Sequence, residues 1–270
     1  MISEQVKNEI EEALLQYFES HSEFQWVNLD KGYFNNNQVI KGNNSEPLAV
    51  CKYFPDDSIF KSEDRMEREI KALKLFGGSY SPNLIWMKKP NLIVYEYIEG
   101  IELLNIEITK PLTKKISKTL TALHDEARLY LGPSREQVIE YYRNLISIYR
   151  SSSLVYPKDL INELVLSVEK QEEILDQYKE NLTFVHGDLV PPNFIINKQI
   201  KLIDWEFFRP ELEFFDYQYF NYYATAHNLK ISLKVPEEIR EFYNNLVDVL
   251  EKLWRFGYLK KNKEIFYSID

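Results

Sequence analysis

The sequence predicts an α+β protein with two lobes, a strand-rich N-terminal lobe and a mostly helical C-terminal lobe. Up to about Tyr97 the apolar residues fall mainly into short extended runs around a single strong helical pattern. After Leu112 they recur at helical spacing instead. The chain has 270 residues, 44% of them hydrophobic, which is enough for two lobes sharing a cleft. We expect lobes of residues 1–97 and 98–270.

The N-terminal lobe should begin with a helix over residues 2–18, where apolar side chains have helical spacing. Strands are predicted within residues 24–42 and 47–54, joined by a turn at residues 43–45 (Asn-Asn-Ser). This connection gives the sheet an antiparallel start.

The one strong helix of this lobe should begin at Ser62, as an N-cap with two acidic residues after it, and should stop at Gly77-Gly78. The run NLIVYEYIEG, residues 91–100, then predicts a strand that ends in a loop. The last part of the predicted N-terminal lobe is therefore extended.

The C-terminal lobe should be built of helices interrupted only by one hairpin near its start. The helical spacing is carried by Leu112, Ile116, Leu120 and Leu123, by Val138, Tyr142, Leu145 and Tyr149, and by Ile239, Tyr243, Leu246 and Leu250. The hairpin should pair residues 193–197 with residues 200–205 about a turn at Lys198-Gln199. Ser151 to Ser153 should form a loop between two helices.

Composition narrows the classes of function. The net charge is −9 and no tract rich in Lys and Arg occurs, which argues against a protein that binds nucleic acid. Cys51 is the only cysteine, so the chain has no internal disulfide and no thiolate metal cluster. The first 18 residues lack the basic and apolar parts of a signal peptide, and no run of about 18 apolar residues occurs. We therefore expect a cytoplasmic protein without membrane association; the oligomeric state is left open.

The predicted hairpin carries an unusual set of polar residues. Asp188 precedes its first strand, Asn193 stands five residues later, and Asp204 ends the second strand. Oxygen ligands of this kind suit Mg²⁺, and phosphoryl transfer depends on metal ions that neutralise phosphate charge. Taken singly, each of the three residues is also common as a turn former or strand-end cap.

Together, HGDLVPPN (residues 186–193) and LIDWE (202–206) resemble the catalytic signature of aminoglycoside phosphotransferases and of choline or thiamine kinases, which are relatives of protein kinases. The resemblance covers most of the chain and implies a bilobal protein-kinase-like fold that binds Mg-ATP in the cleft between the lobes. It implies that Asp188 is the catalytic base or orients the hydroxyl, and that Asn193 and Asp204 bind Mg²⁺. His186 is expected to tie the loop to the metal strand, and Asp216 resembles the aspartate that braces the catalytic loop.

The same family implies a lysine that binds the nucleotide phosphates on the third strand, and the run AVCK places Lys52 there. Its partner should be a glutamate on the next helix. Glu69 falls inside the apolar arc of that helix, with Ile70 and Leu73, so its carboxylate needs a buried cation, for which Lys52 is the candidate. A solvated Glu69 and a surface Lys52 are the alternative.

Two further segments complete the predicted nucleotide site. Tyr95 to Ile98 resembles the hinge between lobes, where backbone groups of Glu96 and Ile98 would bind adenine; an ordinary edge strand would have the same sequence pattern. The stretch DKGYFNNNQ, with Gly32, lies where a phosphate-covering loop belongs, although a plain hairpin turn fits it too. Trp205-Glu206 stand where protein kinases have Phe-Gly, and no APE segment occurs after them, which disfavours a protein substrate.

The phosphate acceptor is predicted only as a class. Ten of the 19 residues from Trp205 to Tyr223 are aromatic, with four carboxylates among them, and such sets can hold a cationic ligand or simply pack a core. We expect an ATP- and Mg²⁺-dependent kinase that phosphorylates a hydroxyl of a small molecule, such as choline, thiamine or an aminoglycoside. The alternative is a catalytically silent nucleotide-binding module that acts through a partner.

Overall fold

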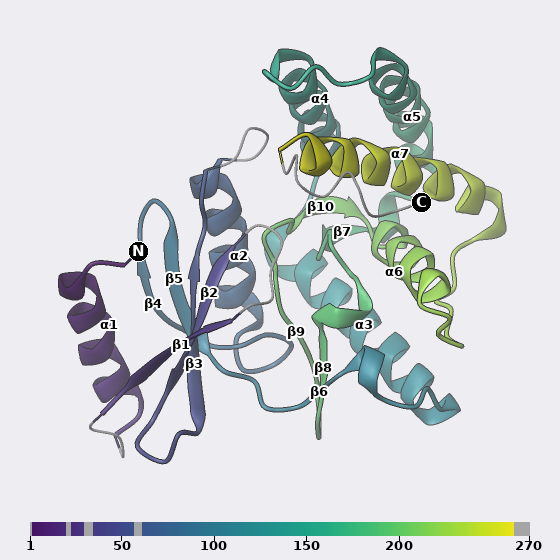
Figure 1. Ribbon diagram of the computed structural model, residues 1–270. Coiled ribbons are helices and arrows are strands. Elements are labelled where there is room, and N and C mark those ends of the chain that lie inside the picture. Colours follow the sequence, from purple (N-terminus) through teal and green to yellow (C-terminus); the bar gives the residue numbers. More distant parts are fainter. Residues whose placement is uncertain (1, 20–22, 30–34, 57–60, 262–270) are drawn as a thin grey trace. The chain divides into compact units, whose positions relative to one another are not determined.

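The computed structural model describes residues 2–19, 23–29, 35–56 and 61–261, and the chain divides into two compact units (Figure 1). The first unit consists of Met1–Leu103 and Asn193–Phe207, and the second of Leu104–Pro192 and Phe208–Asp270. The chain therefore passes between the units three times. The predicted hairpin belongs to the first unit.

A five-stranded antiparallel sheet forms the centre of the first unit, with strand order β1-β2-β3-β5-β4. The strands are β1 (Gln25–Leu29), β2 (Asn36–Lys41), β3 (Pro47–Tyr53), β4 (Leu84–Lys88) and β5 (Leu92–Glu96). The predicted turn between β2 and β3 is confirmed: the Ser45 amide donates to the Gly42 carbonyl at 2.9 Å, and Ser45 has a left-handed φ of 62°. The antiparallel start is thus correct, whereas β4 was not predicted.

Helices cover both faces of this sheet (Figure 1). On one face, Ile10 and Leu14 of α1 (Glu4–Tyr17) pack against Cys51 of β3 and its neighbours. Because successive side chains of a strand point to opposite faces, Lys52 faces the other way, toward α2 (Ser62–Phe76). The alternation of one strand thus separates a purely apolar layer from a layer that holds charged groups.

The helix α2 ends at Phe76, directly before Gly77, as predicted. Its start differs by one residue, because Ser62 is the first helical residue and Lys61 the N-cap. Lys61 gives no side-chain cap; instead the Asp56 carboxylate accepts the Ser62 amide at 3.0 Å. A carboxylate from outside the helix therefore satisfies one of its free N–H groups.

The predicted hairpin is confirmed as β8 (Phe194–Ile196) and β9 (Ile200–Leu202), which pair antiparallel. The short strand β6 (Ile101–Glu102) pairs with β8 and completes a three-stranded sheet. The hairpin is anchored within the first unit, since the Leu202 amide donates to the Tyr80 carbonyl at 2.7 Å. This hydrogen bond therefore fixes the position of the chain just before Asp204.

The second unit is built of five described helices: α3 (Lys110–Leu131), α4 (Arg135–Ser151), α5 (Lys158–Gln177), α6 (Phe214–Ala226) and α7 (Glu237–Lys261). The predicted helical stretches are confirmed in α3, α4 and α7. A loop between helices follows at residues 152–157, although Ser151, which was predicted to lie in it, is the last residue of α4. One expectation was wrong: a second small sheet interrupts the helices, with β7 (Leu182–Val185) antiparallel to β10 (Arg209–Leu212). Within the described residues, no helix combines the length and hydropathy needed to span a membrane.

Candidate active site

The side chain of Lys52 lies between two carboxylates in the first unit. Its Nζ is 2.5 Å from Glu69 Oε2 and 2.5 Å from Asp204 Oδ1. Lys52 and Glu69 are each 1% exposed, whereas the Asp204 side chain is 37% exposed. The predicted pairing of Lys52 with Glu69 is therefore present, and the three residues, called here the lysine cluster, have one accessible carboxylate.

Burial and charge act in opposite directions within the lysine cluster. Burial by itself would lower the pKa of Lys52, but Asp204 and Glu69 outweigh it and hold that pKa well above its usual range. Lys52 is therefore a permanent cation. Burial also raises the pKa of Glu69 to about 7, against the opposing attraction of Lys52. The aromatic ring of Phe54, whose centroid lies 4.9 Å from Lys52 Nζ, adds a favourable contact for the cation.

Asp204 is placed by the end of the hairpin. The strand β9 ends at Leu202, and the Ile203 amide donates to the Asn193 carbonyl at 3.0 Å, which ties the two predicted metal ligands into one short segment. Asp204 itself has a left-handed backbone, with φ of 67°. Such a conformation is uncommon for residues other than glycine and concentrates at functional sites. The buried indole of Trp205 packs 5.2 Å from the Phe76 ring and fixes the chain directly after Asp204 against α2.

These residues suit a magnesium ion bound together with phosphates. Around the lysine cluster, three carboxyl groups, those of Glu69, Asp204 and Glu206, face the two cations Lys52 and Arg65. Within the described residues, no three His, Cys, Asp or Glu side chains form a complete metal cluster. Mg²⁺ commonly takes one or two carboxylates and completes its shell with substrate phosphates and water. Asp204 with Asn193 fits that partial ligand set.

Asp188 lies in the second unit, on a loop held by a buried aspartate. Asp216 accepts the amides of His186 at 2.8 Å and of Gly187 at 3.0 Å, and His124 Nε2 lies 2.9 Å from the same carboxylate. Burial alone would raise the pKa of Asp216, but these partners lower it. The predicted bracing contact of Asp216 with this loop is therefore present.

The loop itself leaves the Asp188 carboxylate half-buried. Gly187 has φ of 81°, a left-handed value that glycine adopts without steric cost. The Asp188 amide lies 3.3 Å from His186 Nδ1, so the His186 ring orders the loop from within; its expected tie to the metal strand stays a prediction.

The predicted hinge residues lie at the end of β5. The Glu96 amide already donates to the Asn83 carbonyl at 2.9 Å, so the backbone group that Glu96 could offer a base is its carbonyl. Ile98 lies just beyond the strand and could offer its amide. Gly32 lies outside the described residues, and its place in a phosphate-covering loop stays a prediction.

A tyrosine-carboxylate group in the second unit was not predicted. Tyr219 and Tyr223 of α6 donate to the two oxygens of Glu251 of α7, each at 2.6 Å. Burial is the main cause that raises the pKa of Tyr219, with the charges of Asp188 and Glu251 adding to it. Another aromatic ring of α6, that of Phe215, already contacts a cation of the protein itself, because Arg209 Cζ lies 4.3 Å from its centroid.

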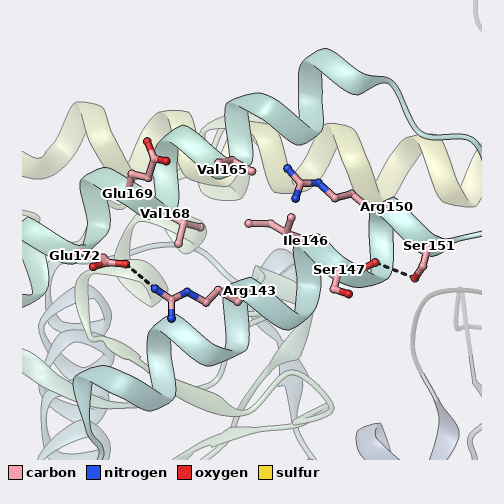
Figure 2. A pocket seen from close by; sticks show the side chains of 9 residues that line it. All are labelled: Arg143, Ile146, Ser147, Arg150, Ser151, Val165, Val168, Glu169 and Glu172. Atoms are coloured by element: carbon pink, nitrogen blue, oxygen red, sulfur yellow. Dashed lines mark hydrogen bonds and ion pairs between the residues drawn. The ribbon is translucent and has the colours of Figure 1, made fainter.

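A pocket of about 570 Å³ lies within the second unit, between α4 and α5 (Figure 2). The residues that line it are Arg143, Ile146, Ser147, Arg150, Ser151, Val165, Val168, Glu169 and Glu172. None of them belongs to the lysine cluster, the Asp188 loop or the tyrosine group. The pocket is therefore not part of the candidate active site.

Solved structures of other kinases share the fold, among them two choline kinases and an aminoglycoside phosphotransferase. A choline kinase from Cryptosporidium parvum Iowa II is 14% identical with a TM-score of 0.63, and the match covers 96% of each chain. The choline kinase LicA from Streptococcus pneumoniae is 20% identical with a TM-score of 0.59, covering 95% of this chain and 92% of that one. An aminoglycoside phosphotransferase from Streptomyces rimosus, in complex with ADP and streptomycin, is 13% identical with a TM-score of 0.55, covering 90% and 97%.

No curated protein sequence matches the chain. The family model for choline/ethanolamine kinase matches residues 48–262, which is most of the chain and includes the lysine cluster, the Asp188 loop and the tyrosine group. The bilobal kinase-like architecture and the choline kinase resemblance are both confirmed by these matches. The chain therefore belongs to the choline/ethanolamine kinase family.

Proposed function

We propose that this small-molecule kinase transfers the γ-phosphate of ATP, with Mg²⁺, to the hydroxyl of a small cationic alcohol. The observation that carries the proposal is the buried Lys52 held between Glu69 and Asp204. A buried cation with one accessible carboxylate beside it is what binding of a metal-triphosphate complex needs.

Each residue has a proposed part in binding. Lys52 binds the α- and β-phosphates and Glu69 orients it. The Glu96 carbonyl and the Ile98 amide bind adenine. Asn193 and Asp204 hold Mg²⁺, which neutralises charge on the phosphates when bound. The family membership supports a phosphotransferase, and the geometry of the lysine cluster supports the nucleotide part.

Asp188 has the proposed part in the chemical step. Its carboxylate orients the acceptor hydroxyl and accepts its proton as the oxygen bonds to the γ-phosphorus. The bond from that phosphorus to the bridging oxygen of ADP breaks, so the products are a phosphate ester and ADP. Asp188 and Asn193 are five positions apart in the chain, so their Cα atoms lie within about 18 Å by covalent geometry alone.

The tyrosine-carboxylate group supports a cationic acceptor. The rings of Tyr219 and Tyr223 lie 5.3 Å apart, and their hydroxyls donate to Glu251, which is 3% exposed. Aromatic faces backed by a carboxylate attract a quaternary or primary ammonium group. We propose that this group, with Asp188 beside it, distinguishes a cationic alcohol from a neutral one.

Two measurements test the proposal. ATP should raise the melting temperature more with Mg²⁺ than without it, and ATP consumption should be measured across choline, ethanolamine, thiamine, sugars and aminoglycosides. Choline should be compared with its neutral isostere 3,3-dimethyl-1-butanol, which has the same shape without the charge. Turnover of the cationic compound alone supports the proposal, and equal turnover of the two removes the cationic part. ATP binding without turnover of any acceptor favours the silent module.

A further inference from the structure

A second buried ion pair lies next to the lysine cluster. Arg65 Nη1 is 3.1 Å from Glu206 Oε2, with Arg65 1% and Glu206 3% exposed. Asn35 contacts both, accepting from Arg65 at 3.2 Å and donating to Glu206 at 3.2 Å. Arg65, Glu206 and Asn35, called here the arginine cluster, join α2, the chain after β9 and the start of β2. Neither Arg65 nor Glu206 has a part in the proposed nucleotide binding, whereas Asn35 belongs to the stretch predicted to cover the phosphates.

The two clusters run side by side between the same two segments. Arg65 and Glu69 are four residues apart on α2 and so share one face of the helix. Asp204 and Glu206 are two residues apart beyond β9. Each cluster thus ties α2 to this segment, and the Phe54 ring lies against both cations, 4.9 Å from Lys52 Nζ and 5.8 Å from Arg65 Cζ.

The Lys52–Asp204 and Arg65–Glu206 ion pairs should be affected differently by nucleotide binding. The tie through Lys52 uses the groups that the proposed function assigns to phosphate and metal, so ligand binding competes with the contact of Lys52 with Asp204. The tie through Arg65 uses no such group. Arg65 also donates to the Pro55 carbonyl, so its charge is held from three sides in a buried place. Separating the two partners of such a pair would leave an uncompensated buried charge. Because this is strongly unfavourable, the ion pair keeps Arg65 and Glu206 in contact.

We infer that Arg65 and Glu206 are positioning residues: their ion pair holds Asp204 against α2 when Lys52 turns to the phosphates. This inference rests on the proposed function for its consequence but not for its geometry. In this arrangement Glu206 positions Asp204, the proposed Mg²⁺ ligand, through the short stretch of backbone between them. Because the Asp204 segment is already ordered by the ion pair, binding of the nucleotide does not have to order it.

The first test measures this order without any ligand. Amide hydrogen exchange of residues 203–207 should be compared between the wild type and Glu206→Gln, with Glu67→Gln as the matched control. Glu67 lies on the same helix as Arg65, 52% exposed, and pairs with Lys89. We expect exchange about tenfold faster in Glu206→Gln alone, because local opening of the segment becomes easier. Unchanged exchange in Glu206→Gln would overturn the inference.

The second test measures the consequence for the reaction. In Glu206→Gln, the Mg²⁺ concentration for half-maximal rate should rise about tenfold, with recovery of the rate at saturating Mg²⁺ and no change in KM for the acceptor. A merely structural defect lowers the rate equally at every Mg²⁺ concentration, and that result contradicts the inference. If the wild type consumes no ATP, the proposed function fails. The hydrogen-exchange result then still decides whether Arg65 and Glu206 hold the Asp204 segment.

A double variant covers the case in which Glu206→Gln does not fold. Arg65→Met/Glu206→Met replaces the buried pair by apolar side chains of similar volume, a change that is often neutral for folding. It should keep the melting temperature of the wild type and still show the faster exchange of residues 203–207. Wild-type exchange in this folded variant would overturn the inference as well.

Discussion

At the scale of single residues, the chemistry depends on carboxylates in different surroundings. Asp188 is half-buried on a loop, Asp216 is buried beneath the same loop, and Asp204 is partly exposed beside a lysine. We therefore expect their removal to have different effects: loss of Asp188 should slow the proposed chemical step, loss of Asp216 should disorder the loop, and loss of Asp204 should weaken the proposed Mg²⁺ binding.

Asp188→Asn should reduce turnover by about 10²- to 10⁴-fold, the range for loss of a general acid or base. Asp216 holds the loop by accepting two of its amides, and these contacts stay intact in the variant, so the melting temperature should stay close to that of the wild type. Single-turnover phosphate transfer and thermal unfolding measure the two effects. A rate near that of the wild type would remove Asp188 from the proposed part.

Asp216→Asn should lower the free energy of unfolding by about 3–5 kcal/mol, as expected when one partner of a buried ionic group is lost. The pKa of Asp216 is lowered in the folded protein, so its stabilisation is complete above the unfolded pKa of Asp and is lost as pH falls through the folded value. The difference between wild type and variant should therefore be constant near neutral pH and shrink in acid. Urea unfolding from neutral to acid pH measures it, and a constant difference would contradict the assignment.

At the scale of elements, β3 illustrates how one strand serves two layers. Lys52 enters the charged layer under α2, while its neighbour Cys51 is 1% exposed in the apolar layer under α1. Burial raises the pKa of the Cys51 thiol to about 12, so little thiolate forms near neutral pH. The reactivity of this thiol therefore reports how firmly α1 covers the sheet.

Leu14→Ala should speed the labelling of Cys51 by a thiol reagent. Leu14 is fully buried against the sheet, and such truncations cost about 2–5 kcal/mol, which makes opening of α1 more frequent. Leu15→Ala is the matched control, since Leu15 is 42% exposed on the same helix. Labelling rates of the native proteins with an aromatic disulfide measure the effect. Equal rates in both variants would show that α1 does not limit access to Cys51.

At the scale of the whole molecule, each unit contains pieces from separate parts of the sequence. The first unit needs residues 193–207, because they supply Asp204 to Lys52, Glu206 to Arg65 and β8 to β6. A fragment that ends at residue 103 leaves Arg65 as a buried cation without its carboxylate. The unit is compact in space without being contiguous in the chain.

A fragment of residues 1–103 should therefore melt at a lower temperature than the same fragment joined to residues 193–207 by a flexible Gly/Ser linker. The expected difference corresponds to about 3–5 kcal/mol, the cost of breaking a buried ion pair from one side. Thermal unfolding followed by circular dichroism compares the two. Equal melting temperatures would show that the added segment contributes nothing to the first unit.

The sequence predicted the parts of the site whose pattern is local. Glu69 could be found because it interrupts an apolar arc, and the motifs that carry Asp188, Asn193 and Asp204 supported the resemblance to a kinase family. Arg65 lies at the edge of that same arc, close to Phe76 on a helical wheel, which is the signal that could have identified it. The pairing of β7 with β10 and the contact of Glu251 with α6 were missed because each joins segments more than 20 residues apart, and short buried strands have no distinctive period.

The three passages of the chain between the units bear on how hybrid kinases can be made. A single exchange point after residue 103 takes Lys52 and Arg65 from one parent and their carboxylates at 204 and 206 from the other. If the two parent sequences differ in charge at position 65 or 206, the hybrid protein contains a buried charge without its partner, however similar the parent sequences are overall. Grafting residues 193–207 together with the N-terminal segment restores matched partners, so recombination of these enzymes calls for a discontinuous cassette.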